Sequence, residues 1–153
     1  MYKRILVAID ATPTDENRSA LKRTEQIGLL TGGTVYVLHV ARSHIVPGDI
    51  TAGSGLGVRS AADDVEVVDR KAVQELVDRL AAAGIDAHGE MVSATDHDVA
   101  DVILQRAREL DVELLVLGHQ HHRGTGGVFR SSVAEQIIHQ HPPISILLAR
   151  PPT

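Results

Sequence analysis

The sequence predicts an α/β protein built on one open, parallel five-stranded sheet with helices on both faces. Short continuous apolar runs alternate along the chain with longer segments in which apolar residues recur at helical spacing. Strands that alternate with helices are joined by right-handed crossovers, which make the strands parallel. A strand that helices cover on both faces carries an uninterrupted apolar run, and residues 5–9 (ILVAI) are such a run.

Nine elements follow one another in the order β-α-β-α-β-α-β-α-β. Apolar runs predict strands over residues 5–9, 34–40, 114–117 and 144–149, and a further strand is predicted over residues 87–92, which include His88 and Glu90. Apolar residues at helical spacing predict helices over residues 20–30, 65–80, 99–107 and 131–139. Thr14 or Asp15 opens the first helix, and Thr95 or Asp96 caps the third. Glycines end the first and second helices, at Gly32, Gly33 and Gly84.

The length and composition favour one soluble domain over residues 1–153. Residues 41–63 carry one proline and four glycines, which predicts a long mobile loop. No apolar run approaches the roughly 18 residues of a membrane span, and no signal-like segment opens the chain, so we expect a cytoplasmic protein that does not bind membranes.

Composition also excludes several classes of function. The formal net charge is −5 and aromatic residues make up 2% of the chain, which argues against a nucleic-acid partner. Because the chain has no cysteine, disulfides, thiol catalysis and thiolate metal sites are excluded.

The segment after the fourth predicted strand has the character of an anion site. The apolar run ends at Gly118, a basic loop with three further glycines follows, and Ser131 and Ser132 open a helical segment. No Asp or Glu occurs between Leu114 and Ala134. Unpaired N–H groups and the positive end of the helix dipole favour an anion at a helix start. The pattern as a whole therefore predicts a phosphate site, whereas a Gly-rich loop without a full motif is, taken alone, usually a flexible connector.

Three stretches of the chain resemble the universal stress proteins: KRILVAID at the start, VYVLHV in the second strand, and VLG, SSVAEQII and HPPISILL in the last third. The resemblance covers essentially the whole chain and implies a Rossmann-like fold of the adenine nucleotide alpha hydrolase type. One branch of that family binds ATP through a loop of the form Gly-x2-Gly-x9-Gly-Ser/Thr. On this chain the pattern falls on Gly118, His121, Ser131 and Ser132, so the spacing is kept but two glycines are replaced.

The same resemblance implies the contacts of the adenosine end. Asp10, at the end of the first strand, matches an acidic residue that contacts the nucleoside. Ala8 and Val40 match positions that meet the adenine through backbone and apolar contacts. From its position alone, Asp10 is equally well explained as a cap of the first helix.

At the phosphate end, the resemblance places Ser132 and Val133 at the start of the helix that receives the phosphates, and Arg130 adds a cationic partner. If both replaced glycines need a positive φ, side chains there cost roughly 2–4 kcal/mol together, or about 30- to 1000-fold in affinity. We therefore expect weak binding of ATP or another adenine nucleotide, with Mg²⁺ accompanying the phosphates.

Two other classes of function stay open. An interaction protein of the same fold would bind no nucleotide and would act through protein partners. A nucleotide-dependent hydrolase is disfavoured, because the chain has no Gly-Lys-Ser/Thr and no Gly-x-Ser-x-Gly after a strand. We therefore expect a regulatory protein that is not an enzyme, with any ATP hydrolysis slow.

The histidines of the chain do not predict a defined metal site. His119, His121 and His122 could hold a transition metal, but nothing in the sequence fixes a geometry, and solvated loop histidines are the simpler interpretation. His39 interrupts an apolar strand and is interpreted as a core histidine with its hydrogen bonds satisfied.

The last strand predicts how the protein assembles. Ile144 to Ala149 (ISILLA) is short, apolar and uncharged, with prolines on both sides. Exposed at the edge of a sheet, such a strand would aggregate unless it were covered or paired. The family resemblance implies a homodimer in which two copies pair this strand across a two-fold axis. The alternative is a strand buried within one monomer. The regulatory protein partner is unknown.

Overall fold

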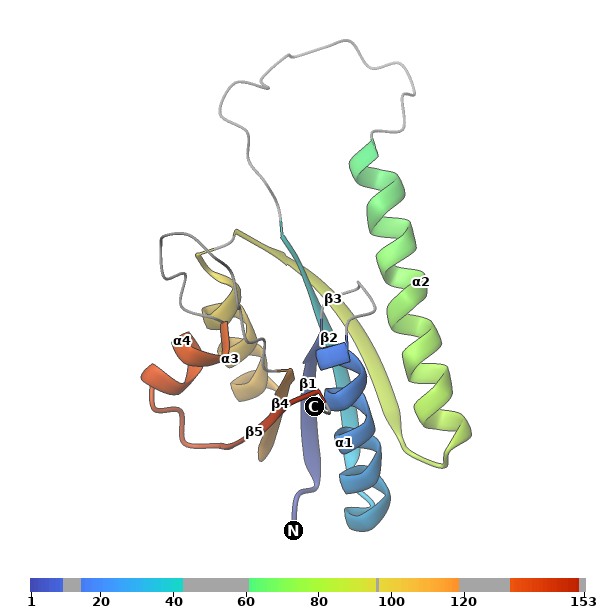
Figure 1. Ribbon diagram of the computed structural model, residues 1–153, viewed down its shortest axis with the longest axis vertical. Helices are drawn as coiled ribbons and strands as arrows, with labels where there is room; N and C mark the ends of the chain where they lie inside the picture. Colours follow the sequence, from blue (N-terminus) through green and yellow to red (C-terminus); the bar gives the residue numbers. More distant parts are fainter. Residues whose placement is uncertain (10–14, 43–60, 96, 119–132, 152–153) are drawn as a thin grey trace.

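The predicted α/β architecture is confirmed by the computed structural model, which describes residues 1–9, 15–42, 61–95, 97–118 and 133–151 (Figure 1). The strands are β1 (Arg4–Ile9), β2 (Thr34–Arg42), β3 (Ala87–Ala94), β4 (Leu114–Gly118) and β5 (Ser145–Ala149). The helices are α1 (Asp15–Thr31), α2 (Ala61–Ala82), α3 (Val99–Glu109) and α4 (Val133–His139).

The five strands form one parallel sheet in the order β3-β2-β1-β4-β5. β1 lies at the centre, and its Ala8 is opposite Leu38 of β2 on one side and Leu117 of β4 on the other. The chain moves outward from β1 to β2 and β3, then crosses back to β4 and β5. The order of the strands therefore reverses between β1 and β4.

Helices cover both faces of the sheet, as the uninterrupted apolar strands predict. Alternate residues of β1 point to opposite faces: Val7 belongs to the same apolar cluster as Val73 of α2, and Leu6 belongs to a separate cluster that contains Ile103 of α3. Figure 1 shows α1 and α2 on one side of the sheet and α3 and α4 on the other. This arrangement buries Leu6 and Val7 completely.

Several predicted boundaries need correction. The segment predicted as a loop over residues 41–63 is shorter, because β2 continues to Arg42 and α2 begins at Ala61; residues 43–60 lie outside the described residues. The N-cap of α3 is Asp98, not Thr95 or Asp96. Thr95 instead donates from its hydroxyl to the Asp98 carboxylate over 2.6 Å, so the two side chains satisfy each other and Asp98 makes no capping hydrogen bond.

The glycines predicted to end α1 and α2 do so with left-handed backbones. Gly32 has a φ of 64° and Gly84 a φ of 92°. Residues with a Cβ rarely adopt these angles, so glycine ends both helices without strain.

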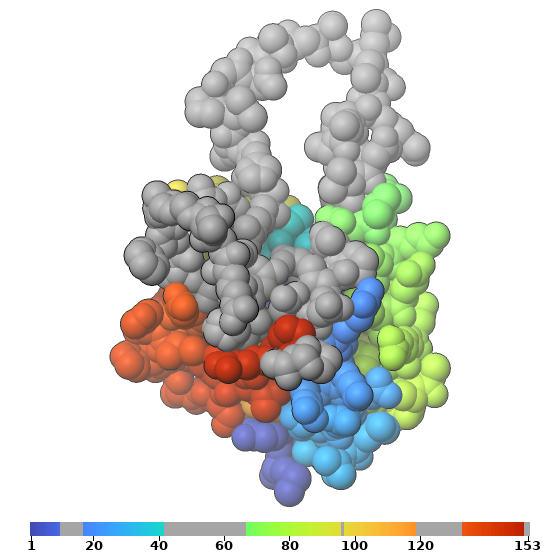
Figure 2. Space-filling view, in the orientation of Figure 1, coloured from blue at the N-terminus to red at the C-terminus, as the bar shows by residue number. Residues whose placement is uncertain are grey.

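The last strand of the chain, β5, is an edge strand of the described sheet. It pairs with β4 alone in the described sheet, and Ile146, Leu147 and Leu148 are only partly buried. In the space-filling view the C-terminal residues, coloured red, lie on the surface between α4 and α1 (Figure 2). In the ranges that the structure describes, no helix is both long enough and apolar enough to cross a membrane.

Candidate functional site

The carboxyl ends of the three central strands meet at one edge of the sheet. β1 ends at Ile9, β4 ends at Gly118, and Val40 lies near the end of β2. The pairing of Ala8 with Leu117 places the chain that leaves β1 beside the chain that leaves β4. In parallel α/β sheets ligands bind beyond the carboxyl ends of the strands where the strand order reverses, which is this position.

An apolar surface lies beneath this edge on the face covered by α3 and α4. Val40 is 5% exposed and belongs to the cluster that also contains Leu117, and both Ala8 and Val133 pack against that cluster. β1, β2 and the start of α4 are thus brought together by one set of apolar contacts.

The structure therefore unites four of the residues that the sequence predicted for the site: Ala8, Val40, Gly118 and Val133. The other predicted site residues lie outside the described residues, namely Asp10, His121, Arg130, Ser131 and Ser132. Chain connectivity alone places Asp10 directly after Ile9 and Ser132 directly before Val133.

α4 begins at Val133 in the described structure, whereas the sequence predicted a start at Ser131. His119 and His122 also lie outside the described residues. Within the described parts of the chain, no group of three or more His, Asp or Glu side chains is placed to hold a metal ion.

His39 is a core histidine with both ring nitrogens partnered, as predicted. It is 5% exposed, with Nδ1 lying 3.1 Å from the carbonyl oxygen of Ile9 and Nε2 lying 3.1 Å from Oδ2 of Asp69. No pattern in the sequence pointed to Asp69, which lies on α2, thirty residues further along the chain. A buried histidine signals that a polar partner exists, but no sequence spacing identifies which carboxylate it is.

Among the described groups, those with shifted pKa values lie away from the carboxyl edge. Arg106 of α3 donates to Glu90 of β3 and to Glu109, each over 2.6 Å, and thereby ties α3 to the sheet. These carboxylates, Glu90 first, raise the pKa of Arg106, and Arg106 lowers the pKa of Glu109. At the amino edge, the backbone N–H of Lys3 lowers the pKa of the Glu113 carboxyl by donating to it.

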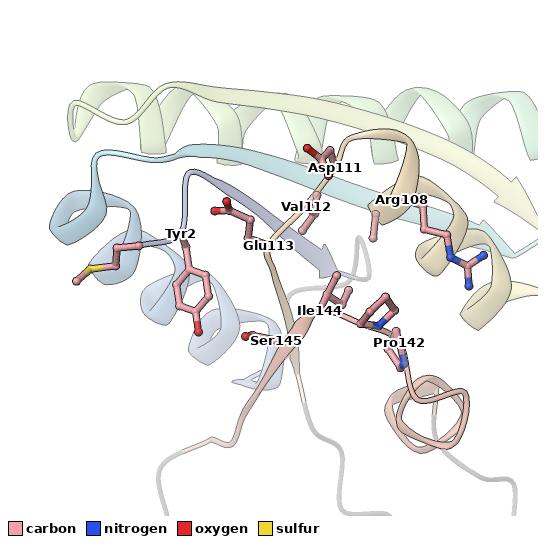
Figure 3. Close-up of a pocket in the computed structure, with 11 residues that line it drawn as sticks. Tyr2, Arg108, Asp111, Val112, Glu113, Pro142, Ile144 and Ser145 are labelled. Carbon is pink, nitrogen blue, oxygen red and sulfur yellow. The ribbon is translucent and has the colours of Figure 1, made fainter.

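A surface cavity of about 830 Å³ also lies at the amino edge, where the chain enters β4 and β5 (Figure 3). Tyr2, Glu113 and Ile144 line it together with the turn at Pro142. In Figure 3 these residues come from the amino end of the chain, the α3–β4 connection and the α4–β5 connection. The cavity is at the opposite edge from Ala8 and Gly118, so it is separate from the site predicted at the strand reversal.

Comparison with known proteins assigns the chain to a family. The family model described as the universal stress protein family matches residues 1–150. No curated protein matches the sequence.

Solved structures with the same fold include three universal stress proteins. One from Burkholderia pseudomallei is 21% identical with a TM-score of 0.70, covering 99% of this chain and 97% of its own. One from Archaeoglobus fulgidus in complex with dAMP is 20% identical with a TM-score of 0.64, covering 97% of this chain and 98% of its own. One from Arabidopsis thaliana with AMP bound is 17% identical with a TM-score of 0.65, covering 99% of this chain and 93% of its own. The family match spans nearly every residue, including all nine elements of the sheet and its helices, and the chain therefore belongs to the universal stress protein family.

Proposed function

We propose that this protein is a regulatory protein that binds an adenine nucleotide at the carboxyl ends of β1, β2 and β4. The observation that carries the proposal is the pairing of Ala8 with Leu117 at the point where the strand order reverses. The family membership supports it, because two universal stress proteins of the same fold hold dAMP and AMP in their structures.

In this proposal, the adenosine and the phosphates contact different residues at the carboxyl ends of the strands. The adenine lies against Ala8 and Val40, which contribute apolar surface to one cluster. Asp10, the first residue after β1, accepts hydrogen bonds from the nucleoside. The phosphates point toward the chain that follows Gly118, where their partners are Arg130, Ser131, Ser132 and the N–H groups near Val133. Mg²⁺ arrives with the phosphates as their counterion.

We propose that the affinity is weak and that the function is regulation and not turnover. His121 and Ser131 stand where the ATP-binding branch of the family has glycine. The chain has no lysine in a Gly-Lys-Ser/Thr sequence, the arrangement that reaches the terminal phosphates in P-loop enzymes. Hydrolysis of a bound ATP is therefore slow.

The test is calorimetry with adenosine and with ATP on the full chain and on three substituted chains. Ala8→Leu enlarges the side chain against which the adenine is proposed to lie and should lower adenosine affinity by about tenfold, equivalent to about 1.4 kcal/mol. Asp10→Ala should lower it several-fold. Ala87→Leu is the matched control, since Ala87 is also half-buried on a strand but lies at the amino end of β3. Its affinity should equal that of the parent.

The outcome also discriminates between function classes. If neither adenosine nor ATP binds the parent chain, and no nucleotide co-purifies in mass spectra of the gently isolated protein, the nucleotide proposal fails. The alternative of an interaction protein without a nucleotide then replaces it. Binding that Ala8→Leu leaves unchanged would place the nucleotide elsewhere on the molecule.

We propose further that two copies form a homodimer through β5. The support is the position of β5 at the edge of the sheet with Ile146 and Leu148 only partly buried. Pairing with a second β5 across a two-fold axis would satisfy the unpaired backbone groups of that edge and close the assembly at two copies. A regulatory protein that distinguishes the nucleotide-bound form from the free form would be a separate partner.

A further inference from the structure

The cavity at the amino edge of the sheet has an apolar floor that belongs to the core. Ala107 and Val112 line it, although they are only 1% and 4% exposed, and Ile144 packs against the same apolar cluster. Two prolines with fixed φ angles, Pro142 and Pro143, also line it. Sites for small molecules are cavities of this size, about 830 Å³, in which a few polar groups surround an apolar surface.

Hydrogen bonds from the first residues of the chain hold the walls of this cavity. Nε of Arg4 donates to the carbonyl oxygen of Asp111 over 2.9 Å, and the same guanidinium pairs with the Asp111 carboxylate. The backbone N–H of Lys3 donates to the Glu113 carboxylate, and the N–H of Ser145 donates to the carbonyl oxygen of Glu113 over 3.2 Å. These bonds join three separate segments, so the cavity is formed without a ligand and binding costs little ordering of the chain.

The polar side chains of the cavity that remain without a partner are hydrogen-bond donors. Within the described parts of the chain, the guanidinium of Arg108 and the hydroxyls of Tyr2 and Ser145 make no hydrogen bond or ion pair. A guanidinium can only donate, and a hydroxyl can donate or accept. The carboxylates of Asp111 and Glu113, by contrast, already accept hydrogen bonds from the first residues of the chain. The cavity therefore favours a ligand that accepts hydrogen bonds, and Arg108 favours one with a negative charge.

The positions of these groups favour one orientation of such a ligand. In Figure 3, Arg108 projects from α3 on one side of the cavity, Tyr2 and Ser145 lie on the other side, and Ile144 lies between them. Glu113 lies on the side of Tyr2, where its negative charge repels an anion. The charged end of a ligand thus belongs at Arg108, and the end near Tyr2 is uncharged.

We propose that this cavity binds an elongated organic acid with a single carboxylate. The carboxylate pairs with Arg108, and the apolar chain of the acid lies over Ile144. A hydroxyl or carbonyl oxygen at the far end of the ligand binds the hydroxyls of Tyr2 and Ser145, while Glu113 excludes a second carboxylate. The site lies at the opposite edge of the sheet from the proposed nucleotide site, so it does not depend on the proposed function.

Octanoate is the first probe, titrated into the full chain with isotope-labelled valine and isoleucine methyl groups and followed by NMR. The methyl signals of Val112 and Ile144 should shift, whereas those of Val40, at the carboxyl ends of the strands, should not. We expect a dissociation constant of about 1 mM, which is ordinary for a ligand of this size. The shifts therefore report both the affinity and the place of binding.

Arg108→Gln tests the proposed ion pair. Because it removes the charge-assisted hydrogen bonds to the carboxylate, it should weaken octanoate binding by about tenfold. Arg79→Gln is the matched control, since Arg79 is also an exposed arginine in the last turn of a helix but stands on α2, outside the cavity. Its affinity for octanoate should equal that of the parent.

Octanedioate tests the exclusion by Glu113. This acid has the length of octanoate but carries a second carboxylate, so it should bind the parent about tenfold more weakly than octanoate does. In Glu113→Gln the repulsion is absent, and the two acids should bind with affinities within about twofold of each other.

A third acid, 8-hydroxyoctanoate, tests the far end of the site. It should bind the parent about threefold more tightly than octanoate, because its hydroxyl reaches the two hydroxyls of the protein. The paired change Tyr2→Phe and Ser145→Ala removes both hydroxyls and should abolish this advantage while leaving octanoate binding unchanged.

Four outcomes would overturn the inference. The site is excluded if octanoate shifts no methyl signal at concentrations up to about 10 mM. Shifts at Val40 in place of Val112 and Ile144 would put the acid at the other edge of the sheet. Unchanged binding to Arg108→Gln, with urea denaturation showing a folded variant, would remove the ion pair. Octanedioate binding the parent as tightly as octanoate would refute the exclusion by Glu113. The nucleotide proposal is tested separately, by calorimetry with adenosine.

Discussion

Gly89 of β3 lies directly beneath Val73 of α2. A Cβ placed on Gly89 would stand 2.8 Å from Cγ1 of Val73 and 2.8 Å from Cγ2 of Val77, closer than two carbon atoms can approach. The missing side chain thus lets α2 sit close to the sheet. This spacing also sets how near Asp69, one turn before Val73 on the same helix, comes to His39.

Replacing Gly89 should therefore destabilise the protein by overpacking. In Gly89→Ala the new methyl group collides with two valines, whose β-branched side chains cannot turn aside within a helix. We expect the free energy of unfolding to fall by about 1–3 kcal/mol, measured by urea denaturation. Adding Val73→Ala should recover part of the loss, so that the double variant is more stable than the sum of the two single effects predicts. Strict additivity would mean that the two positions do not contact each other.

Restoring the family glycines should strengthen binding of the phosphates. The paired change His121→Gly and Ser131→Gly removes two Cβ atoms at positions where the family loop has glycine. If those positions need a positive φ, ATP affinity should rise by up to about 30- to 1000-fold, whereas adenosine affinity should stay near that of the parent. Calorimetry with both ligands checks this. A double variant that binds ATP no better than the parent would show that these positions do not limit binding.

A charge on the edge strand should dissociate the proposed dimer. Ile146→Lys places an ammonium group on β5, where the second copy would pair, and desolvating it would disfavour association. Analytical ultracentrifugation should then report a monomer of about 16 kDa, where the parent sediments as a dimer. Leu30→Lys is the control, since Leu30 of α1 is 82% exposed and far from β5 in sequence. A folded Ile146→Lys variant that stays dimeric would place the interface elsewhere, and a monomeric parent would exclude the dimer.

Acid should remove a contribution to stability from Glu113. The backbone N–H of Lys3 is the main cause that lowers the pKa of this carboxyl below its ordinary value of 4.5. A carboxyl whose pKa is lower in the folded state stabilises that state above the unfolded pKa, and the effect disappears as pH falls through the folded pKa. The parent should thus be more stable than Glu113→Gln at neutral pH, and the difference should shrink below about pH 4.5. Urea denaturation across this range measures it; a difference that persists unchanged in acid would contradict the assignment.

The sequence by itself determined the elements and their chemistry. Continuous apolar runs identified β1 and β4, because a strand buried on both faces carries no polar residue to interrupt the pattern. Gly32 and Gly84 marked where α1 and α2 end, since only glycine adopts their backbone angles freely. These are local properties, which neighbouring residues along the chain set by themselves.

Tertiary structure decided which distant residues meet. The strand order, with β1 between β2 and β4, depends on pairings such as Ala8 with Leu117, which no periodicity in the sequence encodes. The carboxylate that partners His39 was decided in the same way, because Asp69 lies thirty residues away on α2 and only the packing of that helix brings it to the ring. The N-cap of α3 is Asp98 and not one of the predicted residues, and its carboxylate accepts a hydrogen bond from the Thr95 hydroxyl. Hydrophobic patterning fixes which face of a helix or strand is buried. Because the hydrophobic effect has no direction, it does not select which element packs against that face, and the packing of the whole core decides this.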